Sequence, residues 1–523
     1  HILNLLTIPA LVFIYYFRTT ERVTGWGVVK AILAACAILL AINSLIIPYT
    51  VAIGAAFDKV FVNSLGLPIN SGLLFFVVAL FVALGWAVWY TYKKGKVVAN
   101  TIILCLTVVL LGYGSYASVV IRAAVNPPMN SNDPDNPYSL LSLLNRDQYG
   151  NRPLFYGAPY TAPIIDYEWG TVTFVGDDGK YKTEPSISGY VYPPGFQQFF
   201  PRMYSSLKAQ GYEDWVDVKG RTVRLGNQAF KVPTFGENLK FFFSYQFNFM
   251  YWRYFLWNFV GRQSNNQSTG EITDGNWLSG IPFIDEIYLG PQDNLPSEMA
   301  VNKGRNTYYF LPFILGVLGL IYQLSRDKRN FTVVLWLFVM MGIALVFYFN
   351  TAPSEPRERD YVYAGSFYAF CIWIGFGVIW IQEILARLFK RDNVASALVA
   401  TLICSCVPII LAAENWDDHD RSHRYAGRDL GYDYLQSTLP NSIIMNYGDN
   451  DTFPLWYNQE VEGVRKDVRV MNMSYLTGEW YIDEMKYRIN ESDPVPFSFP
   501  RRVYTNRNES IGVEERNGGK PLD

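Results

Sequence analysis

The sequence is poor in charge. Of its 523 residues only 17% are charged and 50% are hydrophobic, whereas soluble proteins carry about 25% charged residues. The deficit is concentrated in runs of about 20 residues that contain almost no charge, which is typical of helices that span a membrane. The sequence therefore predicts a membrane protein.

Further absences exclude several classes of function. All five cysteines lie inside apolar runs, so the polar segments contain neither a disulfide framework nor a cysteine-based zinc site. The formal net charge of -2 argues against a nucleic-acid partner, which would favour a basic face. The sequence also has no glycine-rich phosphate loop and no dinucleotide fingerprint.

Eight apolar runs predict membrane spans, about four within 1–121 and about four within 307–413. The runs are 2–17, 27–48, 72–92, 97–121, 307–323, 331–349, 361–385 and 394–413. Because His1 already lies in an apolar run, we expect the chain to begin inside a longer protein.

Lysine and arginine orient the connectors between these runs. The short basic connectors 18–22, 93–96, 326–329 and 387–391 should be cytoplasmic by the positive-inside rule. The alternate segments should then face outside, and these are 49–71, 122–306, 350–360 and the chain after Glu414.

The outer segments differ in character. Residues 122–236 are rich in Pro, Gly, Asn and Asp with short strand patterns, which predicts an extracytoplasmic loop domain. Residues 237–306 open with a dense aromatic run, which favours helices lying in the headgroup interface. An aromatic helix packed on its own outer domain is the alternative.

The segment 414–523 predicts a soluble extracytoplasmic α/β domain. A helix over 428–438 precedes a strand at 442–447, a turn at 448–451, a helix at 455–461 and a second strand at 468–473. We expect this domain to extend beyond Asp523.

The hairpin 350–360 contains the densest cluster of charges. Glu355, Arg357, Glu358, Arg359 and Asp360 fall within six positions. Arginines on an outer loop run against the positive-inside rule, so they call for a reason. They either pair with the neighbouring carboxylates, which contributes little at a surface, or grip a phosphate with their guanidinium forks. The residues alone leave both interpretations open.

Two other polar clusters lie on the expected outer face. Arg253 and Arg262 could hold phosphate while Trp252 and Trp257 stack on a sugar, although anchoring in lipid is the commoner use of such residues. The third cluster contains carboxylates that could bind a divalent cation, but Asp and Asn in a tight turn more often cap the backbone. It consists of Asp417, Asp418, His419, Asp420, Arg421 and His423, followed by Asp449 and Asp451.

Over nearly its whole length the chain resembles a bacterial membrane family. The resemblance rests on Asn126–Met129, Leu144–Gly150, Met250–Gln263, Glu355–Tyr361 and Tyr447–Trp456. The family is common in Bacteroidetes, was long labelled as of unknown function, and is similar to the eukaryotic transmembrane protein O-mannosyltransferases. That group is glycosyltransferase family 117 within the GT-C superfamily.

The resemblance implies a GT-C-like polytopic helical fold in the bacterial inner membrane, with its large loops and C-terminal domain in the periplasm. It implies transfer of a sugar, mannose, from a polyprenyl-phosphate donor to Ser or Thr of an exported protein. The partners would be that donor, the acceptor protein and the lipid bilayer. The resemblance also places the acidic catalytic residue of such enzymes before His1.

Within this chain the site candidates follow from the same resemblance and the polar clusters. Glu355, Glu358 and Asp360 are secondary catalytic candidates, Arg357, Arg359, Arg253 and Arg262 are candidates for the donor phosphate, and Trp252, Trp257 and Tyr361 are candidates for sugar or lipid contact. Asp449 and Asp451 are weak metal candidates, and these residues indicate no cofactor other than a divalent cation.

The sequence is also compatible with functions other than glycosyl transfer. A non-catalytic membrane scaffold or receptor that binds a periplasmic partner is the main alternative. A transporter is disfavoured because the spans contain few ionisable residues. If the hairpin and the aromatic run serve one donor, Glu355–Tyr361 should line an outward-facing pocket with part of 245–262 as its wall or lid.

Overall fold

The computed structural model describes residues 2–147, 152–176, 178–390 and 394–504. Gln148–Gly150, Arg391 and the end of the C-terminal domain, all discussed above, lie outside these residues. The chain divides into two compact units. Unit 1 is His1–Ala41, Asn151–Asp166 and Val191–Arg421, and unit 2 is Ile42–Gly150, Tyr167–Tyr190 and Ser422–Asp523.

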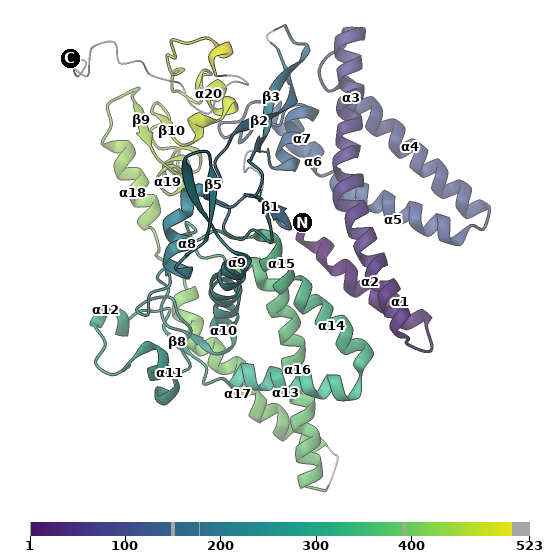
Figure 1. Cartoon of the computed structure of the whole chain (residues 1–523), viewed down its shortest axis with the longest axis vertical. Coiled ribbons are helices and arrows are strands. Elements are labelled where there is room, and N and C mark those ends of the chain that lie inside the picture. Colours follow the sequence, from purple (N-terminus) through teal and green to yellow (C-terminus); the bar gives the residue numbers. More distant parts are fainter. Residues whose placement is uncertain (1, 148–151, 177, 391–393, 505–523) are drawn as a thin grey trace. The chain divides into compact units, whose positions relative to one another are not determined.

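The chain is a polytopic helical membrane protein, which confirms the fold class expected from the sequence (Figure 1). Within the described residues, six helices are long and apolar enough to cross a membrane. They are Gly25–Leu65, Ser71–Lys93, Val97–Ala123, Lys328–Phe349, Asp360–Leu388 and Val394–His419.

The structure differs from the expected spans near the N-terminus and at 307–323. The first apolar run forms a 3-10 helix, Ile2–Thr7, and the short helix α1, Ile8–Thr19. The run at 307–323 forms α13, Leu311–Arg326, whose 16 residues fall short of the roughly 20 that a perpendicular crossing needs.

The connector expected over 49–71 is helical as far as Leu65. Helix α2, Gly25–Leu40, continues through a π-helical stretch, Ala41–Ile46, into α3, Ile47–Leu65. Asp58 lies within this helix and is buried inside unit 2. Its carboxylate accepts hydrogen bonds from the Gly72 amide at 2.8 Å and the Tyr181 hydroxyl at 2.6 Å. A charge satisfied in this way no longer opposes helix formation.

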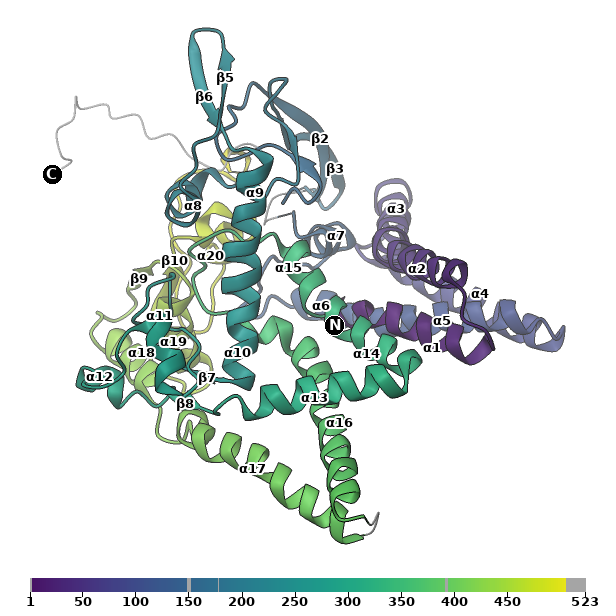
Figure 2. The ribbon, with the colours of Figure 1, turned by 60° about the horizontal axis from the view of Figure 1, so that its bottom comes forward.

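The aromatic run forms the centre of unit 1. Helix α9, Phe235–Phe241, continues through the π-helical stretch Phe242–Trp252 into α10, Arg253–Phe259, and Figure 2 shows them as one long helix. Most of its aromatic side chains are buried against other parts of unit 1, including α14, Lys328–Met340, α15, Ile343–Phe349, and α16, Ala364–Leu388. The sequence favours a headgroup position, but the structure surrounds this helix with protein, which is closer to the alternative of packing on protein.

Close packing joins α13 to α16. A Cβ added to Gly319 would lie 1.7 Å from the Trp373 carbonyl oxygen, and one added to Gly377 would lie 2.2 Å from the Leu315 carbonyl oxygen. The Trp373 indole also donates a 2.8 Å hydrogen bond to Gln323. Small residues at the contact therefore let the two backbones approach closely, as is usual between membrane helices.

Basic connectors meet at one end of unit 1. Arg329 donates to the backbone oxygens of Phe17 at 3.3 Å and Glu21 at 2.6 Å. Arg326 and Arg387 both reach the Glu383 carboxylate, at 2.8 and 3.4 Å. Since α14 and α15 lead away from this end and α16 returns to it, the hairpin between them lies at the opposite end of the helices.

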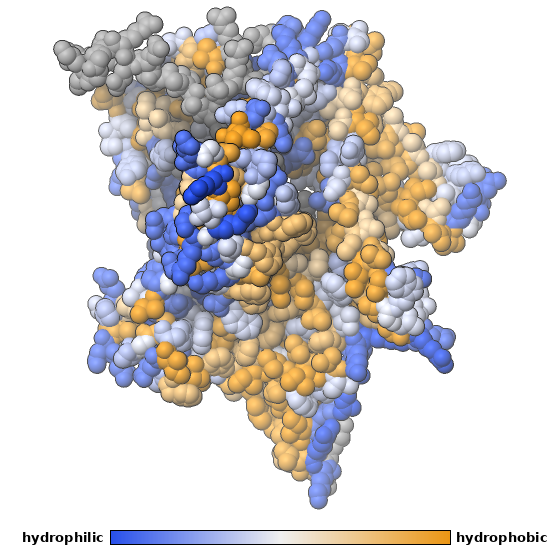
Figure 3. Space-filling model, viewed as in Figure 1, coloured by the Kyte–Doolittle hydropathy of each residue, from blue (hydrophilic) through white to orange (hydrophobic). Residues whose placement is uncertain are grey.

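Apart from one long helix, the remaining elements of unit 1 are short. The strand pairs are β1, Tyr156–Gly157, with β4, Gln198–Phe199; β5, Arg221–Leu225, with β6, Gln228–Val232; and β7, Gly261–Arg262, with β8, Asn306–Thr307. The short helices are α8, Ala209–Val216, α11, Pro282–Leu289, and α12, Ser297–Ala300, and the last long helix is α17, Val394–His419. Figure 3 shows a hydrophilic surface over the β5–β6 hairpin and an apolar one over α13 and α16.

Unit 2 combines helices with a small α/β domain. The helices are α3, α4, Ser71–Lys93, α5, Val97–Tyr113, α6, Tyr116–Ala123, and α7, Pro137–Asn145, accompanied by the strand pair β2, Asp166–Val175, and β3, Tyr181–Val191. The α/β domain contains α18, Ala426–Gln436, β9, Ile443–Asn446, α19, Asp449–Glu460, β10, Arg469–Asn472, and α20, Glu479–Met485.

The pairing within the α/β domain follows the sequence pattern. Strands β9 and β10 are parallel, with Ile443 opposite Arg469 and Asn446 opposite Asn472. Helix α19 connects them, which is the strand–helix–strand unit that the sequence predicts. Where the sequence predicts a turn at 448–451, residues 449–451 form the first turn of α19, and Gly448 precedes the helix with a φ of 98°.

Candidate functional site

The hairpin is anchored where it begins. Asn350 ends α15 in the left-handed conformation, with a φ of 42°, and is fully buried. Its amide nitrogen donates to the carbonyl oxygens of Pro153 at 2.8 Å and Pro201 at 3.0 Å. Its amide oxygen accepts from Gln246 of the aromatic helix at 3.0 Å. The hairpin is thus fixed both to the loop segments of unit 1 and to the aromatic helix.

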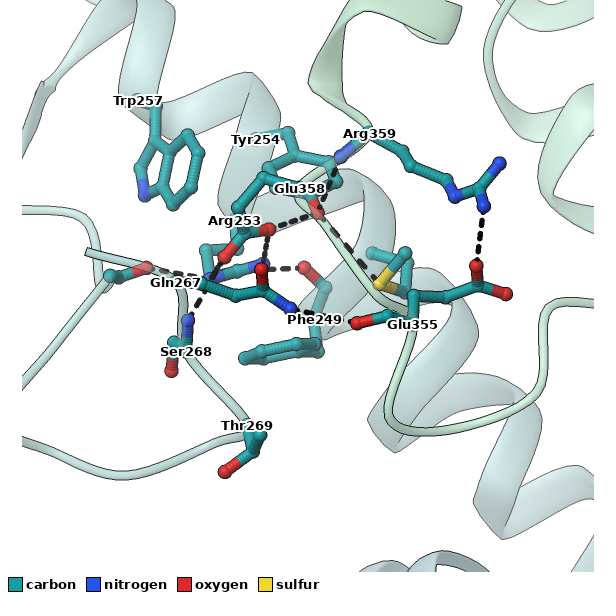
Figure 4. A network of polar contacts seen from close by, with 12 residues as sticks. Phe249, Arg253, Tyr254, Trp257, Gln267, Ser268, Thr269, Glu355, Glu358 and Arg359 are labelled. Carbon is teal, nitrogen blue, oxygen red and sulfur yellow. Dashed lines mark hydrogen bonds and ion pairs between the residues drawn. The ribbon is translucent and has the colours of Figure 1, made fainter. Parts of the chain in front are cut away.

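Glu358 is the centre of a polar network (Figure 4). Its carboxylate lies 2.9 Å and 3.3 Å from the two terminal nitrogens of Arg253. It also accepts from the Tyr254 hydroxyl and, at 3.1 Å, from the Ser268 amide. The Arg253 side chain is 5% exposed and that of Glu358 18%. This carboxylate is held by protein donors and is not poised as a free base.

The rest of the Arg253 guanidinium is also taken up by protein. Its Nε donates to the Phe249 carbonyl oxygen at 2.9 Å and one terminal nitrogen donates to the Gly275 carbonyl oxygen at 2.7 Å. Its faces lie 3.6 Å from the Phe249 ring centroid and 4.6 Å from that of Trp257. The structure therefore gives Arg253, expected as a phosphate ligand, an internal role.

Arg359 pairs within the hairpin. Its guanidinium lies 2.8 Å from the Glu355 carboxylate, and its backbone amide donates to the Tyr254 hydroxyl at 3.2 Å. Gln267 fixes the same turn by donating to the Glu355 carbonyl oxygen at 2.7 Å. For Arg359 the structure supports the mutual-pairing interpretation of the hairpin charges.

Arg357 has a different environment. It is exposed, and across the described residues its guanidinium has no hydrogen bond and no ion pair. It lines a small cavity, here the hairpin cavity, formed by Ser354, Glu355, Arg357, Glu358, Gln267–Thr269, Tyr245, Phe249, Met250 and Tyr254. The hairpin and the aromatic run therefore converge, as the sequence predicts.

The hairpin cavity is narrow. Its volume of about 20 Å³ is enough for about one water molecule. A phosphate would consequently lie at its mouth, where Arg357 is exposed, rather than inside it. That a ligand binds there, and that the cavity faces outward, stay predictions.

The other aromatic candidates are packed against protein. Trp257 is 4% exposed, and its indole donates to the Asn276 carbonyl oxygen at 3.1 Å. Trp252 stacks on Phe255, with 5.2 Å between ring centroids, inside the helical core. Tyr361 is 56% exposed, so among the three it is the residue with a free surface.

Arg262 is partly buried against Trp257 and is affected by the charge of Asp360. Arg262 lies over the Trp257 ring at 4.0 Å from its centroid, and its Nε is buried without a hydrogen-bond partner in the described part of the chain. Burial lowers the pKa of Arg262, while Asp360 acts in the opposite direction. The negative charge of Asp360 therefore offsets part of the effect of burial on Arg262, although no ion pair joins the two side chains in the described part of the chain.

The third polar cluster joins α17 to β8. Asp418 accepts from Asn306 at 3.1 Å, and Asn415 accepts from Asn306 at 3.0 Å and from the Tyr308 hydroxyl at 2.9 Å. His419 Nδ1 lies 2.7 Å from the Asp418 carboxylate. These contacts hold the end of a long helix against a short strand, which is a structural task.

Asp449 and Asp451, the weak metal candidates, lie in the first turn of α19. Asp449 accepts from the Tyr475 hydroxyl and Asp451 is exposed. Carboxylates at this position interact favourably with the helix dipole. Among the residues described, no group of three or more His, Cys, Asp or Glu side chains is arranged to hold a metal ion; a divalent cation stays a prediction.

The loop 263–277 contains no site residue predicted from the sequence. Besides contacting the hairpin, it lines a second and larger cavity, here the polar cavity, of about 270 Å³. The signal available in the sequence is the density of Asn, Gln, Ser, Thr and Asp over 263–276. The lining residues are Gln263, Ser264, Asn266, Thr273, Asp274, Pro296, Glu298, Met299 and Asn302.

Known proteins resemble separate parts of the chain. Residues 150–243 match a family of unknown function (DUF8416), and residues 427–518 match the TMEM260-associated domain 2. A Dictyostelium discoideum protein named "Protein O-mannosyl-transferase tmem260" is 26% identical over 191 residues, which cover 32% of this chain and 23% of that protein. The match thus spans about a quarter of the length of the curated relative. No solved structure matches the chain. These findings relate the chain to the TMEM260 family.

Proposed function

We propose that this protein is a GT-C-type membrane glycosyltransferase. It moves a sugar, mannose, from a polyprenyl-phosphate donor to a Ser or Thr of an exported protein, at the outer face of the bacterial inner membrane. The distant similarity to a protein named as an O-mannosyl-transferase and the six apolar helices of the described residues support this class of enzyme. The observation that carries the proposal is the exposed, unpaired guanidinium of Arg357 beside the hairpin cavity.

The arginines around the hairpin differ in how they are paired. Arg253 is neutralised by Glu358 and Arg359 by Glu355, while Arg262 has Asp360 as its largest opposing charge. Neither Arg262 nor Arg357 forms an ion pair among the described residues, but Arg262 is partly buried, whereas Arg357 is exposed and lines the hairpin cavity. A phosphate at this point would find a charge-assisted donor that needs no ion pair to be broken first.

Arg357 would act on the leaving group. The acceptor hydroxyl oxygen attacks the anomeric carbon of the sugar, its proton passes to a base, and the bond between that carbon and the phosphate oxygen breaks. The departing lipid phosphate gains negative charge as this bond lengthens, and the guanidinium stabilises that charge. Glu358 already accepts from Arg253, Tyr254 and Ser268, so it serves as the partner of Arg253 rather than as the base.

Removing the Arg357 guanidinium should slow transfer. A hydrogen bond to a charged group contributes about 1.5–3 kcal/mol, so Arg357→Ala in the full-length protein should lower transfer from polyprenyl-phosphate mannose by roughly 10- to 100-fold. The exposed Arg224 on β5 offers a matched control, since Arg224→Ala removes the same charge away from the hairpin. Wild-type turnover by Arg357→Ala would exclude the hairpin from the mechanism. A non-catalytic receptor would show no donor-dependent transfer in any of these proteins.

A further inference from the structure

The polar cavity has an unusual lining. Of its nine described residues, seven carry amide, hydroxyl or carboxylate groups, two are the apolar Pro296 and Met299, and none is a lysine or arginine. Two of the polar residues, Asp274 and Glu298, are acidic. This lining disfavours an anion. A cation is also unsupported, because no group of three or more potential ligands converges anywhere in the described chain.

Hydrogen bonds within the loop fix the lining in place. One Asp274 carboxylate oxygen accepts from the Ser264 hydroxyl at 3.1 Å and from the Asn266 amide at 2.8 Å. The Ser264 hydroxyl in turn accepts from the Gly275 amide at 3.0 Å. Gln263, 3% exposed, is held by the Asn276 amides at 3.1 and 2.8 Å. The wall is preorganised rather than assembled by a ligand.

The same network leaves groups free to bind. Asp274 keeps its second carboxylate oxygen, and Glu298 has no partner among the described residues. Asn302 uses its amide oxygen to accept from Asn265 at 3.2 Å and Gly304 at 2.9 Å, which leaves its NH₂ group as a donor. Acceptors and a donor facing one cavity match the neighbouring hydroxyls of a sugar, each of which can both donate and accept.

Size and position agree with this chemistry. Pockets for drug-sized ligands begin at about 300 Å³, so a cavity of about 270 Å³ suits a smaller molecule such as one hexose. The loop 263–277 also lines the hairpin cavity through Gln267–Thr269. The two cavities therefore share one wall.

We propose that the polar cavity binds a neutral hexose, the sugar of the lipid-phosphate donor, while Arg357 binds its phosphate. The proposal rests on the proposed function for the identity of the donor. A sugar already attached to an acceptor protein has the same chemistry and is the other source to be distinguished.

Binding measurements on the full chain in nanodiscs separate these possibilities. The probes are polyprenyl phosphate, polyprenyl-phosphate mannose and methyl mannoside. Asp274→Asn keeps the internally bonded oxygen and converts the free one to a donor, so it should weaken binding of polyprenyl-phosphate mannose about tenfold, which is one charged hydrogen bond. It should leave sugar-free polyprenyl phosphate unaffected, whereas Arg357→Ala should weaken both lipids.

Control variants keep the test independent of folding. Glu286→Gln changes an exposed acid of α11 outside the cavity and should bind all probes as the wild type does. Asn302→Ala removes the free donor from another part of the wall and should reproduce the effect of Asp274→Asn.

The outcomes are distinct. Unchanged binding of polyprenyl-phosphate mannose in both cavity variants would overturn the proposal. Weaker binding of methyl mannoside with unchanged lipid binding would overturn the assignment to the donor and favour an acceptor sugar. Mannoside binding that depends on Asp274 in a protein that binds neither lipid would retain the sugar site and refute the proposed transferase.

Discussion

The ion pairs of the hairpin differ in burial, and burial determines what each contributes. In the pair of Arg253 with Glu358 the side chains are 5% and 18% exposed, whereas in that of Arg359 with Glu355 they are 37% and 16% exposed. Removing one partner of a buried pair leaves the other charge uncompensated in the protein interior. When one partner of an exposed pair is removed, water solvates the remaining charge.

Neutralising Glu358 should therefore destabilise unit 1. We expect Glu358→Gln to lower the free energy of unfolding by about 3 kcal/mol, because Arg253 would remain buried without its counter-charge. Glu355→Gln is the matched control and should cost about 1 kcal/mol or less. Unfolding in detergent, followed by tryptophan fluorescence, measures both. Equal losses in the two variants would contradict this account.

At the same scale, the sequence could place the site but not assign its arginines. Alternation of spans brings the hairpin and the aromatic run to one end of the helices, and that convergence can be predicted from residue types. Which arginine stays unpaired depends on contacts such as that of Arg253 with Glu358, which are 105 residues apart. No local pattern encodes that choice.

Among the helices, the crossing of α13 and α16 is the contact most sensitive to side-chain size. A Cβ at Gly319 of α13 would overlap the Trp373 carbonyl oxygen of α16. A Cβ at Gly375, which lies on α16, meets nothing within 4 Å. We expect Gly319→Ala to destabilise the protein by about 3 kcal/mol, since overpacking forces the backbones apart. Gly375→Ala should be neutral or slightly stabilising.

Thermal unfolding of the purified variants measures this difference. A Gly319→Ala protein as stable as Gly375→Ala would show that the two helices are not in backbone contact.

Some helices and strands follow from residues that are adjacent in sequence, and others depend on contacts with distant residues. The strand–helix–strand unit of β9, α19 and β10 follows from alternation and turn residues that are adjacent in sequence. The length of α3 does not, because the buried charge of Asp58 is satisfied there by Gly72 and Tyr181, the latter 123 residues away. The surroundings of the aromatic helix are also undetermined, since lipid and a protein core select the same apolar side chains.

For the molecule as a whole, the distribution of charge predicts its orientation. The connector containing Arg326 and Arg329 and the hairpin containing Arg357 lie at opposite ends of the helices of unit 1. By the positive-inside rule the first should be cytoplasmic. We expect a membrane-impermeant maleimide to label Ser354→Cys in intact cells and to label Ser325→Cys only after permeabilisation, both serines being exposed.

The experiment requires a parent protein without its five native cysteines, four of which are exposed on helices. Labelling of both positions from the same side of the membrane would contradict the predicted topology.

Similarity to known families is also unevenly distributed over the molecule. The matched segments 150–243 and 427–518 both lie outside the six apolar helices of the described residues. Spans are built from a few interchangeable apolar residues, so their sequences carry little family-specific information. The periplasmic location and the inner membrane also stay proposals, because the hydropathy of a span does not distinguish one membrane from another.

Gly275 contacts residues that line both cavities, Ser264 of the polar cavity and Ser268 of the hairpin cavity. Its carbonyl oxygen accepts from Arg253, its amide donates to Ser264, and a Cβ there would lie 2.7 Å from the Ser268 side chain in a backbone with a φ of 65°. In genetic terms, the effect of a mutation at this glycine would not be separable into effects on one cavity or the other. A mutation at Gly275 would damage the hairpin network and the polar cavity together, so no second mutation confined to one cavity would act as its suppressor.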